Sequence, residues 1–181
     1  LSGTQAKAAS GEALKAVGFY VVSPGSTYQL QVRTGVTGEP STGTLVYEQG
    51  GTIAAPGYHT ISLSEQIPLT GGTKFAVTVR LTTPGYNYPI PLESREIGYS
   101  DKASANAGES YVSSNGTAWA DLTATTGNAH SNVALKAFTG SYSGPTTPTP
   151  GGSTDGGGGC STLGFAPLGM LFLVPFLILK K

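Results

Sequence analysis

Cysteine is nearly missing from this sequence of 181 residues, because Cys160 is the only one. A single cysteine excludes an intrachain disulfide, so a folded body must be held together by its hydrophobic core. Charge is also scarce: charged residues make up 11% of the chain, and the formal net charge is zero. Phosphate binding needs a surplus of lysine and arginine, so the composition excludes nucleic acid as the main partner.

Residues suited to catalysis are few as well. His59 and His130 are the only histidines, and Cys160 lies far along the chain from both. The sequence contains no HExxH, GxSxG, P-loop, CxxC or EF-hand pattern. We therefore expect no enzymatic activity, no cofactor and no metal site. Because His59 shares a face with Ile61 and Leu63, we expect it in the core or an interface, and His130 in a solvated loop.

The beginning of the sequence lacks a leader. Residue 1 is Leu, and no basic segment followed by an apolar segment is visible. We interpret the chain as the C-terminal piece of a longer exported precursor. A mature form whose signal peptide has been removed is the alternative.

Composition divides the chain into three parts. Residues 1–140 alternate apolar and polar positions, as expected for a folded domain. Residues 141–159 read SYSGPTTPTPGGSTDGGGG, and their lack of apolar side chains predicts a disordered, flexible Pro/Thr/Gly-rich linker. Residues 160–181 form an apolar tail.

The tail carries an uncharged run at positions 163–179, which is just long enough for a helix to cross a membrane. Pro167 and Pro175 interrupt the run, and bilayer helices tolerate proline better than soluble helices do. The terminal Lys180 and Lys181 follow the positive-inside rule and put the body outside the cytoplasm. We predict a C-terminal hydrophobic helix that spans the membrane. A buried helix of the body is the alternative.

The run GGGGCSTLGFAPLGMLFLVPFLILKK resembles a C-terminal sorting signal of the Synergist-CTERM type, with a Gly-rich stretch, a Cys, an apolar span and a basic end. The resemblance implies recognition by a membrane processing peptidase, with cleavage or lipid attachment at Gly159 and Cys160. It also implies an exported protein anchored in the membrane at the cell surface. A free thiol beside the membrane is the alternative for Cys160.

The body shows period-2 patterning, which is typical of half-buried β-strands. The clearest strand has Phe75, Val77, Val79 and Leu81 on one face. Further strands are predicted at residues 15–21, 28–33, 44–48, 59–63, 90–93, 111–114, 119–122 and 133–137. Short strands separated by turns predict an all-β fold, an antiparallel β-sandwich of jelly-roll type. A closed barrel is the alternative.

Two connections are unusual. Asn115-Gly116 lies between two predicted strands and favours a type I′ hairpin turn. Asn115-Gly116-Thr117 also matches the N-glycosylation sequon, but the turn already explains these residues. Residues 82–110 form a connection with three prolines and three tyrosines. A connection of this length is usually functional or locally packed.

Several blocks of the body are similar to the lectin-like β-sandwich domain: ALKAVGFYV, TLVYEQGGTI, GYHTISL, LTTPGYNYPIPLE, GESYVSSNGTAW and VALKAFT. That domain is often found C-terminal to papain-type cysteine peptidase domains in bacterial and archaeal surface proteins. The resemblance covers about residues 4–139. It implies a non-catalytic accessory module, with a peptidase domain before Leu1. The family's name describes a fold similarity and does not establish sugar binding.

A ligand site is expected in and near the long connection, because sugars pack on aromatic faces and hydrogen-bond to polar side chains. The candidate ligand-binding residues are Tyr86, Asn87, Tyr99, Asp101 and Trp119. Packing onto the sandwich is the favoured interpretation for Tyr88, Tyr111 and Trp119, since large aromatics are mostly buried. Asp101 and Glu109 are alternative oxygen ligands for Ca²⁺.

The expected function is a cell-surface accessory module that binds a glycan or protein target, or positions an upstream peptidase domain. A structural spacer that supports the upstream peptidase domain and has no ligand of its own is the alternative.

Overall fold

The computed structural model describes residues 1–144, which form one compact unit. Along these residues the elements are β1 (Ser2–Lys7), β2 (Glu12–Val21), β3 (Ser26–Thr34), β4 (Thr44–Ile53), β5 (Gly57–Pro68), β6 (Lys74–Thr82), β7 (Leu92–Ser94), β8 (Ser110–Val112), β9 (Ala120–Asp121), η1 (Leu122–Ala124), β10 (Ser131–Val133) and β11 (Leu135–Ser141). The predicted linker beyond position 144 and the tail with Gly159 and Cys160 lie outside the described residues.

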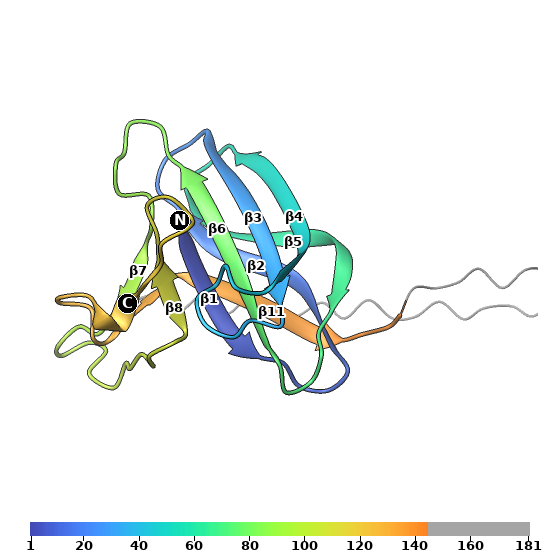
Figure 1. Ribbon diagram of the computed structural model, residues 1–181. Helices are drawn as coiled ribbons and strands as arrows, with labels where there is room; N and C mark the ends of the chain where they lie inside the picture. Colours follow the sequence, from blue (N-terminus) through green and yellow to red (C-terminus); the bar gives the residue numbers. More distant parts are fainter. Residues whose placement is uncertain (145–181) are drawn as a thin grey trace, which may run out of the picture. The chain divides into compact units, whose positions relative to one another are not determined.

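The strands form two large sheets and one small sheet (Figure 1). The strand order is β4-β3-β6-β1-β8-β9 in the six-stranded sheet and β11-β2-β5 in the three-stranded sheet, and β10 pairs with β7. All of these pairings are antiparallel. The antiparallel β-sandwich predicted from the sequence is confirmed. Within residues 1–144, each large sheet ends in edge strands and does not close on itself, so the closed-barrel alternative is wrong.

The hydrophobic core lies between the two large sheets, because alternate residues of their central strands point inward. Its members include Val17, Phe19 and Val21 from β2, Leu30 and Val32 from β3, and Val77 and Val79 from β6, all buried. Burial of each such side chain contributes roughly 1.5–3 kcal/mol. The alternation recognised in the sequence is therefore the alternation between core and outer face.

Strand β1 is absent from the predicted elements, although it lies between β6 and β8 within the six-stranded sheet. Its sequence, SGTQAK, offers no alternating apolar residues. The outer face of β1 is covered by the loop that follows β3. Gln5 Nε2 donates a hydrogen bond of 2.8 Å to Gly38 O, and Pro40 Cγ would lie 3.2 Å from a Cβ added to Gly3. Polar side chains are therefore buried here.

The Asn115-Gly116 hairpin exists, but its predicted turn type is wrong. Strands β8 and β9 pair as expected, with Val112 opposite Ala120. This register leaves the seven residues 113–119 in the connection, where a type I′ turn would leave two. The Asn115 side chain explains the wider loop, because its Oδ1 accepts the Thr117 N–H at 2.9 Å.

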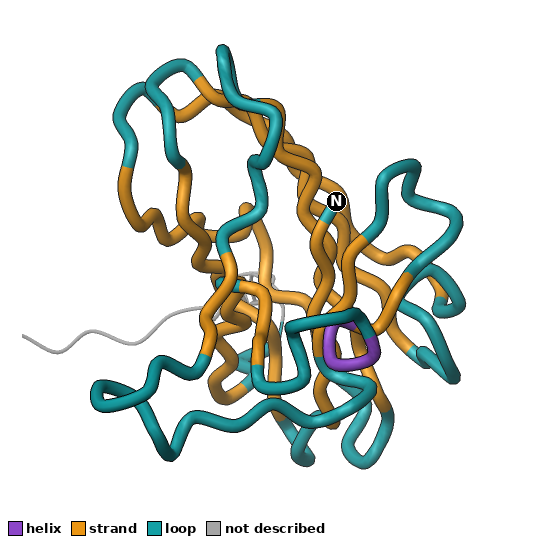
Figure 2. Tube along the Cα trace, turned by 90° about the vertical axis from the view of Figure 1, so that its left-hand side faces the viewer, coloured by secondary structure: helices purple, strands orange, loops and turns teal. Residues whose placement is uncertain are grey.

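Other boundaries differ from the predicted strands in detail. The predicted strand at 119–122 is only Ala120–Asp121, followed by the single 3-10 turn Leu122–Ala124, drawn in purple in Figure 2. The predicted strand at 90–93 is shifted to Leu92–Ser94. The final predicted strand is split at Ala134 into β10 and β11. In residues 1–144 no helix has the length and apolar character needed to cross a membrane.

Candidate functional site

The connection between β6 and β8, residues 83–109, is fixed to the body at its middle by β7. Ser94 Oγ lies 2.8 Å from Ser131 Oγ on β10, and Pro91 O accepts the Ala134 N–H at 3.0 Å. Figure 1 shows the green part of this loop before β7 and the yellow-green part after it. Strand β7 therefore divides the predicted ligand-binding connection into two halves.

The half before β7 exposes Tyr86, Asn87 and Tyr88. Tyr88 is 79% exposed, so the favoured interpretation that it packs onto the sandwich is wrong. The Tyr86 and Tyr88 rings instead meet each other edge to face, with centroids 6.3 Å apart. Ile90 packs against the core and anchors this half. An inward apolar residue thus allows its polar and aromatic neighbours to point outward.

The half after β7 contains a tight turn that presents Ile97 and Tyr99. Their side chains are 85% and 91% exposed. The Ser100 N–H donates to Glu96 O at 2.8 Å, and the Gly98 N–H donates to Asp101 Oδ1 at the same distance. Asp101, a predicted ligand residue, is therefore already used to hold the turn. Ile97 and Tyr99 therefore form an exposed apolar tip, and hydrogen bonds within the turn brace the backbone that carries them.

Trp119 and Tyr111 are half-buried, in agreement with packing for these two aromatics. Trp119 belongs to the loop between β8 and β9. Its Nε1 donates to Gly116 O at 3.2 Å, and its ring lies beside Gly3. The candidate ligand-binding residues therefore come from three separate turns: Tyr86 and Asn87 from one, Tyr99 and Asp101 from another, and Trp119 from a third.

The carboxylates of Asp101 and Glu109 have different hydrogen-bond partners. Asp101 accepts from the Gly98 backbone, whereas Glu109 Oε1 accepts from Asn106 Nδ2 at 3.1 Å. Across residues 1–144, no three His, Cys, Asp or Glu side chains are grouped so as to hold a metal ion. The two carboxylates proposed for Ca²⁺ are thus part of two local turns.

Asp121 connects the end of the 83–109 loop to the body. Its Oδ2 accepts the Gly108 N–H at 2.6 Å, and its Oδ1 accepts the hydroxyl and the N–H of Thr123 at 2.7 and 3.0 Å. Burial alone would raise the pKa of Asp121, but these hydrogen bonds outweigh it and lower that pKa. Burial, together with the charges of Asp121 and Glu39, raises the pKa of Tyr111.

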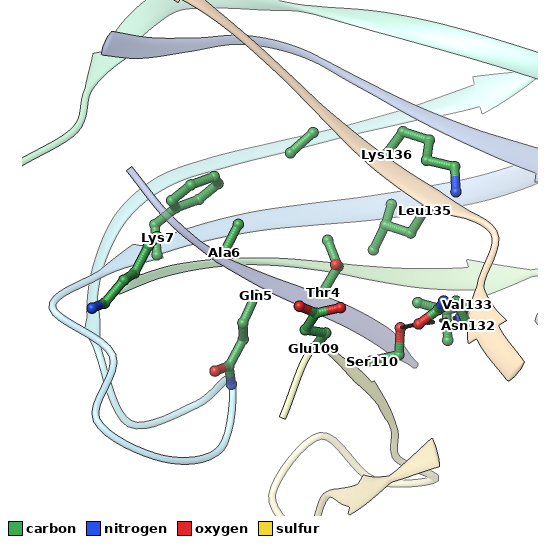
Figure 3. Close-up of a pocket in the computed structure, with 12 residues that line it drawn as sticks. Thr4, Gln5, Ala6, Lys7, Glu109, Ser110, Asn132, Val133, Leu135 and Lys136 are labelled. Atoms are coloured by element: carbon green, nitrogen blue, oxygen red, sulfur yellow. Dashed lines mark hydrogen bonds between the residues drawn. The ribbon is translucent and has the colours of Figure 1, made fainter. Parts of the chain in front are cut away.

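A cleft of about 420 Å³ opens between β1 and β11 (Figure 3). Thr4 on β1 and Leu135 on β11 face it, and Lys136 lies at its rim, paired with Glu93 of β7. Gln5 points the other way, toward the loop that carries Gly38. The cleft is thus the open side of the sandwich next to the edge strand β11.

The polar groups of the cleft bond to each other. Ser110 Oγ donates to Asn132 Oδ1 at 2.9 Å and accepts the Val133 N–H at 3.3 Å. Asn132 Nδ2 donates to Ser104 O at 3.4 Å. The Ser110 hydroxyl is therefore engaged in joining β8 to β10, and an activated nucleophile would instead need a base beside it.

Neither histidine lines this cleft. His59 lies on β5 with Ile61 and Leu63, which pack against the core, and its Nε2 is 2.9 Å from Ala55 O. His59 thus shares a face with residues that pack against the core, but it is itself only partly buried and is not one of the core residues. His130 is exposed in the turn before β10, as expected.

A second group of exposed aromatic side chains lies on the outer face of the three-stranded sheet: Tyr20, Tyr58 and Phe138. None of them is among the predicted site residues. Tyr20 alternates with the buried Phe19 and Val21, so the register of β2 already puts an aromatic ring on the outer face. An aromatic residue in the polar phase of an amphipathic strand is the signal that identifies this group.

Comparison with known proteins supports the fold. A family model described as "Lectin like domain" matches residues 6–139. The crystal structure of the cysteine protease and lectin-like domains of Cwp84, a surface layer associated protein of Clostridium difficile, shares 24% identity with a TM-score of 0.61 and covers 78% of this chain and 32% of its own. The clostridial cysteine protease Cwp84 after propeptide cleavage gives the same identity and TM-score, with 36% of its chain covered.

This chain therefore spans about a third of the length of the solved structures it matches. No curated protein sequence matches it. At this level of identity the solved structures establish a shared fold, and the family model establishes the kinship.

Proposed function

The chain belongs to the lectin-like domain family, and from this premise we propose that its β-sandwich is a non-catalytic accessory module of an exported cell-surface protein. In this function it works beside a cysteine protease domain that precedes Leu1. Support comes from the solved structures of the same fold, in which a lectin-like domain and a cysteine protease domain occupy one chain.

The observation that carries this proposal is the braced turn after β7. Ile97 and Tyr99 are almost fully exposed, yet hydrogen bonds within the turn hold its backbone. Exposed apolar side chains on a fixed support are typical of interaction sites, because their ordering costs little entropy on binding. This turn is the contact surface of the module, and Tyr86, Asn87, Asp101 and Trp119 are candidates for further contacts.

Anchoring at the cell surface is part of the same proposal and rests on the sequence. The tail resembles a sorting signal, with processing at Gly159 or Cys160 and with the membrane and a processing peptidase as partners. The intact mass of the protein isolated from its cells tests this. We expect a mass that corresponds to a chain ending before Lys181. A mass that corresponds to a chain ending at Lys181 would contradict processing.

The first experiment on the accessory function is to determine the coding sequence before Leu1. It should encode a papain-type catalytic Cys and His, because the proposal places a cysteine protease domain there. Any other domain in that position contradicts the proposal.

The second experiment mixes the 181-residue chain with that cysteine protease domain and measures their association by calorimetry. Replacement of both Ile97 and Tyr99 with Ser should weaken association at least about tenfold, since it removes the apolar tip. Tyr88→Ser is the matched control, because it removes a largely exposed aromatic from the other half of the loop. Equal affinities for all three chains would contradict a contact at this turn.

A spacer without any ligand is the second candidate, favoured by the cleft whose polar groups already bond to one another. In that case the protease domain should be less thermally stable without this chain, because the spacer supports its fold, and the chain should bind no polysaccharide and no other protein target.

A further inference from the structure

The outer face of the three-stranded sheet carries one half-exposed aromatic ring from each of its strands. Tyr20 on β2 is 45% exposed, Tyr58 on β5 is 42% exposed, and Phe138 on β11 is 43% exposed. Tyr20 pairs directly with Tyr58, and their ring centroids are 5.0 Å apart. Phe138 pairs with Ala16, two rows further along β2. We call these three side chains the aromatic strip.

Gly18 lies in the row between the two ends of the strip and leaves room for the aromatic side chains on either side of it. A Cβ on Gly18 would be 2.0 Å from Tyr58 Oη and 3.0 Å from Phe138 Cε2. Gly18 is not among the glycines with positive φ, so its backbone does not require glycine. It is buried although it faces outward. The Tyr58 and Phe138 side chains therefore reach over Gly18 from both sides, and the Tyr20 ring meets the Tyr58 ring at an interplanar angle of 60°.

The dimensions of the strip fit a narrow ligand better than a protein. At a little under half exposure, three aromatic side chains present about 250–300 Å² of apolar surface. A stable protein interface buries roughly 800 Å² on each partner. Along β2, the strip extends over the four steps from Ala16 to Tyr20, which is about 13 Å. It is thus long, thin and too small for a typical interface.

The surroundings of the strip are polar and rigid. Thr60 and Ser62 of β5 are exposed on the same face, beside Gly18 and Ala16, and Lys136 of β11 lies opposite Gly18. Sugar rings combine C–H faces, which pack on aromatic rings, with hydroxyl groups that need hydrogen-bond partners at the edge. Paired strands fix the backbone beneath these side chains, so little backbone entropy is lost on binding.

We propose that the aromatic strip is a polysaccharide-binding site, in which sugar rings stack on Tyr20, Tyr58 and Phe138. The site lies on a different sheet from the 83–109 loop. It does not depend on the cysteine protease neighbour of the proposed function, so the two proposals can fail separately.

Affinity electrophoresis of the 181-residue chain tests the site, in gels that contain one soluble neutral polysaccharide each: β-glucan, xylan, galactomannan, mannan or dextran. The unmodified chain should be retarded by at least one of them. Tyr58→Ala should weaken that retention about tenfold because a stacking ring is lost, whereas Tyr58→Phe should keep it. Tyr88→Ala, which removes an exposed aromatic elsewhere, should leave it unchanged.

Gly18→Ala tests whether binding requires the arrangement of the three rings and not only their presence. The new methyl group would displace the Tyr58 ring while all three aromatics remain, so retention should fall about as much as in Tyr58→Ala. Thermal unfolding of each variant, measured by circular dichroism, should stay within a few degrees of the unmodified chain, because the strip faces outward.

Three results would overturn the proposal. The first is no retardation of the unmodified chain in any gel. The second is equal retention of the unmodified, Tyr58→Ala and Gly18→Ala chains. The third is loss of binding to the cysteine protease domain, rather than to polysaccharide, in the strip variants, which would identify the strip as a protein contact.

Discussion

The 83–109 loop and the three-stranded sheet both expose aromatic side chains, but different interactions hold them. In the loop, Tyr99 is 91% exposed and its turn is closed by the bond from Ser100 N to Glu96 O, four residues apart. In the sheet, Tyr20 is 45% exposed and its neighbour Tyr58 comes from a strand almost forty residues away. The loop displays its rings by local turns, whereas the sheet displays them through the whole fold.

The difference should appear most strongly in stability. Phe19 is the buried neighbour of Tyr20 on β2, with its ring 5.6 Å from that of Tyr28. Phe19→Ala should lower the free energy of unfolding by about 3–5 kcal/mol, through lost burial and a cavity. Tyr99→Ala should change it by less than about 0.5 kcal/mol, because its ring packs on little. Urea denaturation of the 181-residue chain measures both, and similar losses would contradict the comparison.

The strands of the large sheets are also the part of the fold that the sequence predicts well. Strands β3 and β6 place apolar residues at alternate positions, and so does β2 from Val17 to Val21, because one face of each meets the core. Strand β1 does not, since its outer face is covered by the loop with Gly38 and Pro40 and so buries polar Gln5. Period-2 patterning finds a strand that places large apolar side chains at alternate positions, and it misses β1, whose sequence SGTQAK has none.

The candidate site was predictable only in part. The length and tyrosine content of residues 82–110 singled this segment out as functional or locally packed, but did not show which aromatics it exposes, because Ile90 rather than Tyr88 anchors it. Trp119 belongs to another turn, and the sequence does not show how that turn is placed relative to residues 82–110, because their arrangement arises only on folding. Tyr20 was visible as an aromatic in the polar phase of β2, yet its meaning depends on Tyr58 and Phe138, whose strands are brought together only by folding.

The next largest effect should come from Asp121, which ties the end of the loop to the body. Asp121→Asn keeps the size of the side chain but removes its charge and at least one accepted hydrogen bond. The free energy of unfolding should fall by about 1–2 kcal/mol at neutral pH. Asp101→Asn is the control, since Asp101 supports only the exposed turn.

The pH dependence of this effect follows from the lowered pKa of Asp121. A carboxyl with a lower pKa in the folded state stabilises the fold fully above its ordinary value of 3.8. That stabilisation is lost as pH falls through the lowered folded value. The difference between Asp121→Asn and the unmodified chain should therefore shrink below about pH 4. A difference that stays constant from pH 7 to pH 2 would contradict a role for the charge.

A smaller effect is expected from Gly98, which allows the turn that presents Tyr99. Its φ is 81°, a conformation that side chains with a Cβ rarely adopt. Gly98→Ala should cost about 1 kcal/mol in thermal unfolding and speed amide hydrogen exchange at Ser100. Gly38→Ala is the matched control, since its φ is not positive and an added Cβ would come no closer than 3.8 Å to Thr42. Equal costs for the two glycines would argue against strain at the turn.

The smallest effect concerns the ion pair that joins the two regions, Lys136 of β11 with Glu93 of β7. Both side chains are nearly half exposed, at 46% and 45%, so water and salt screen their attraction. Glu93→Gln should cost less than about 0.5 kcal/mol, and 1 M salt should abolish the difference. The small cost is expected because β7 is already held by the Ser94–Ser131 contact and by Pro91 O. A loss above about 1 kcal/mol that disappears in 1 M salt would contradict this small value and would mean that the loop and the sheet are coupled through their charges.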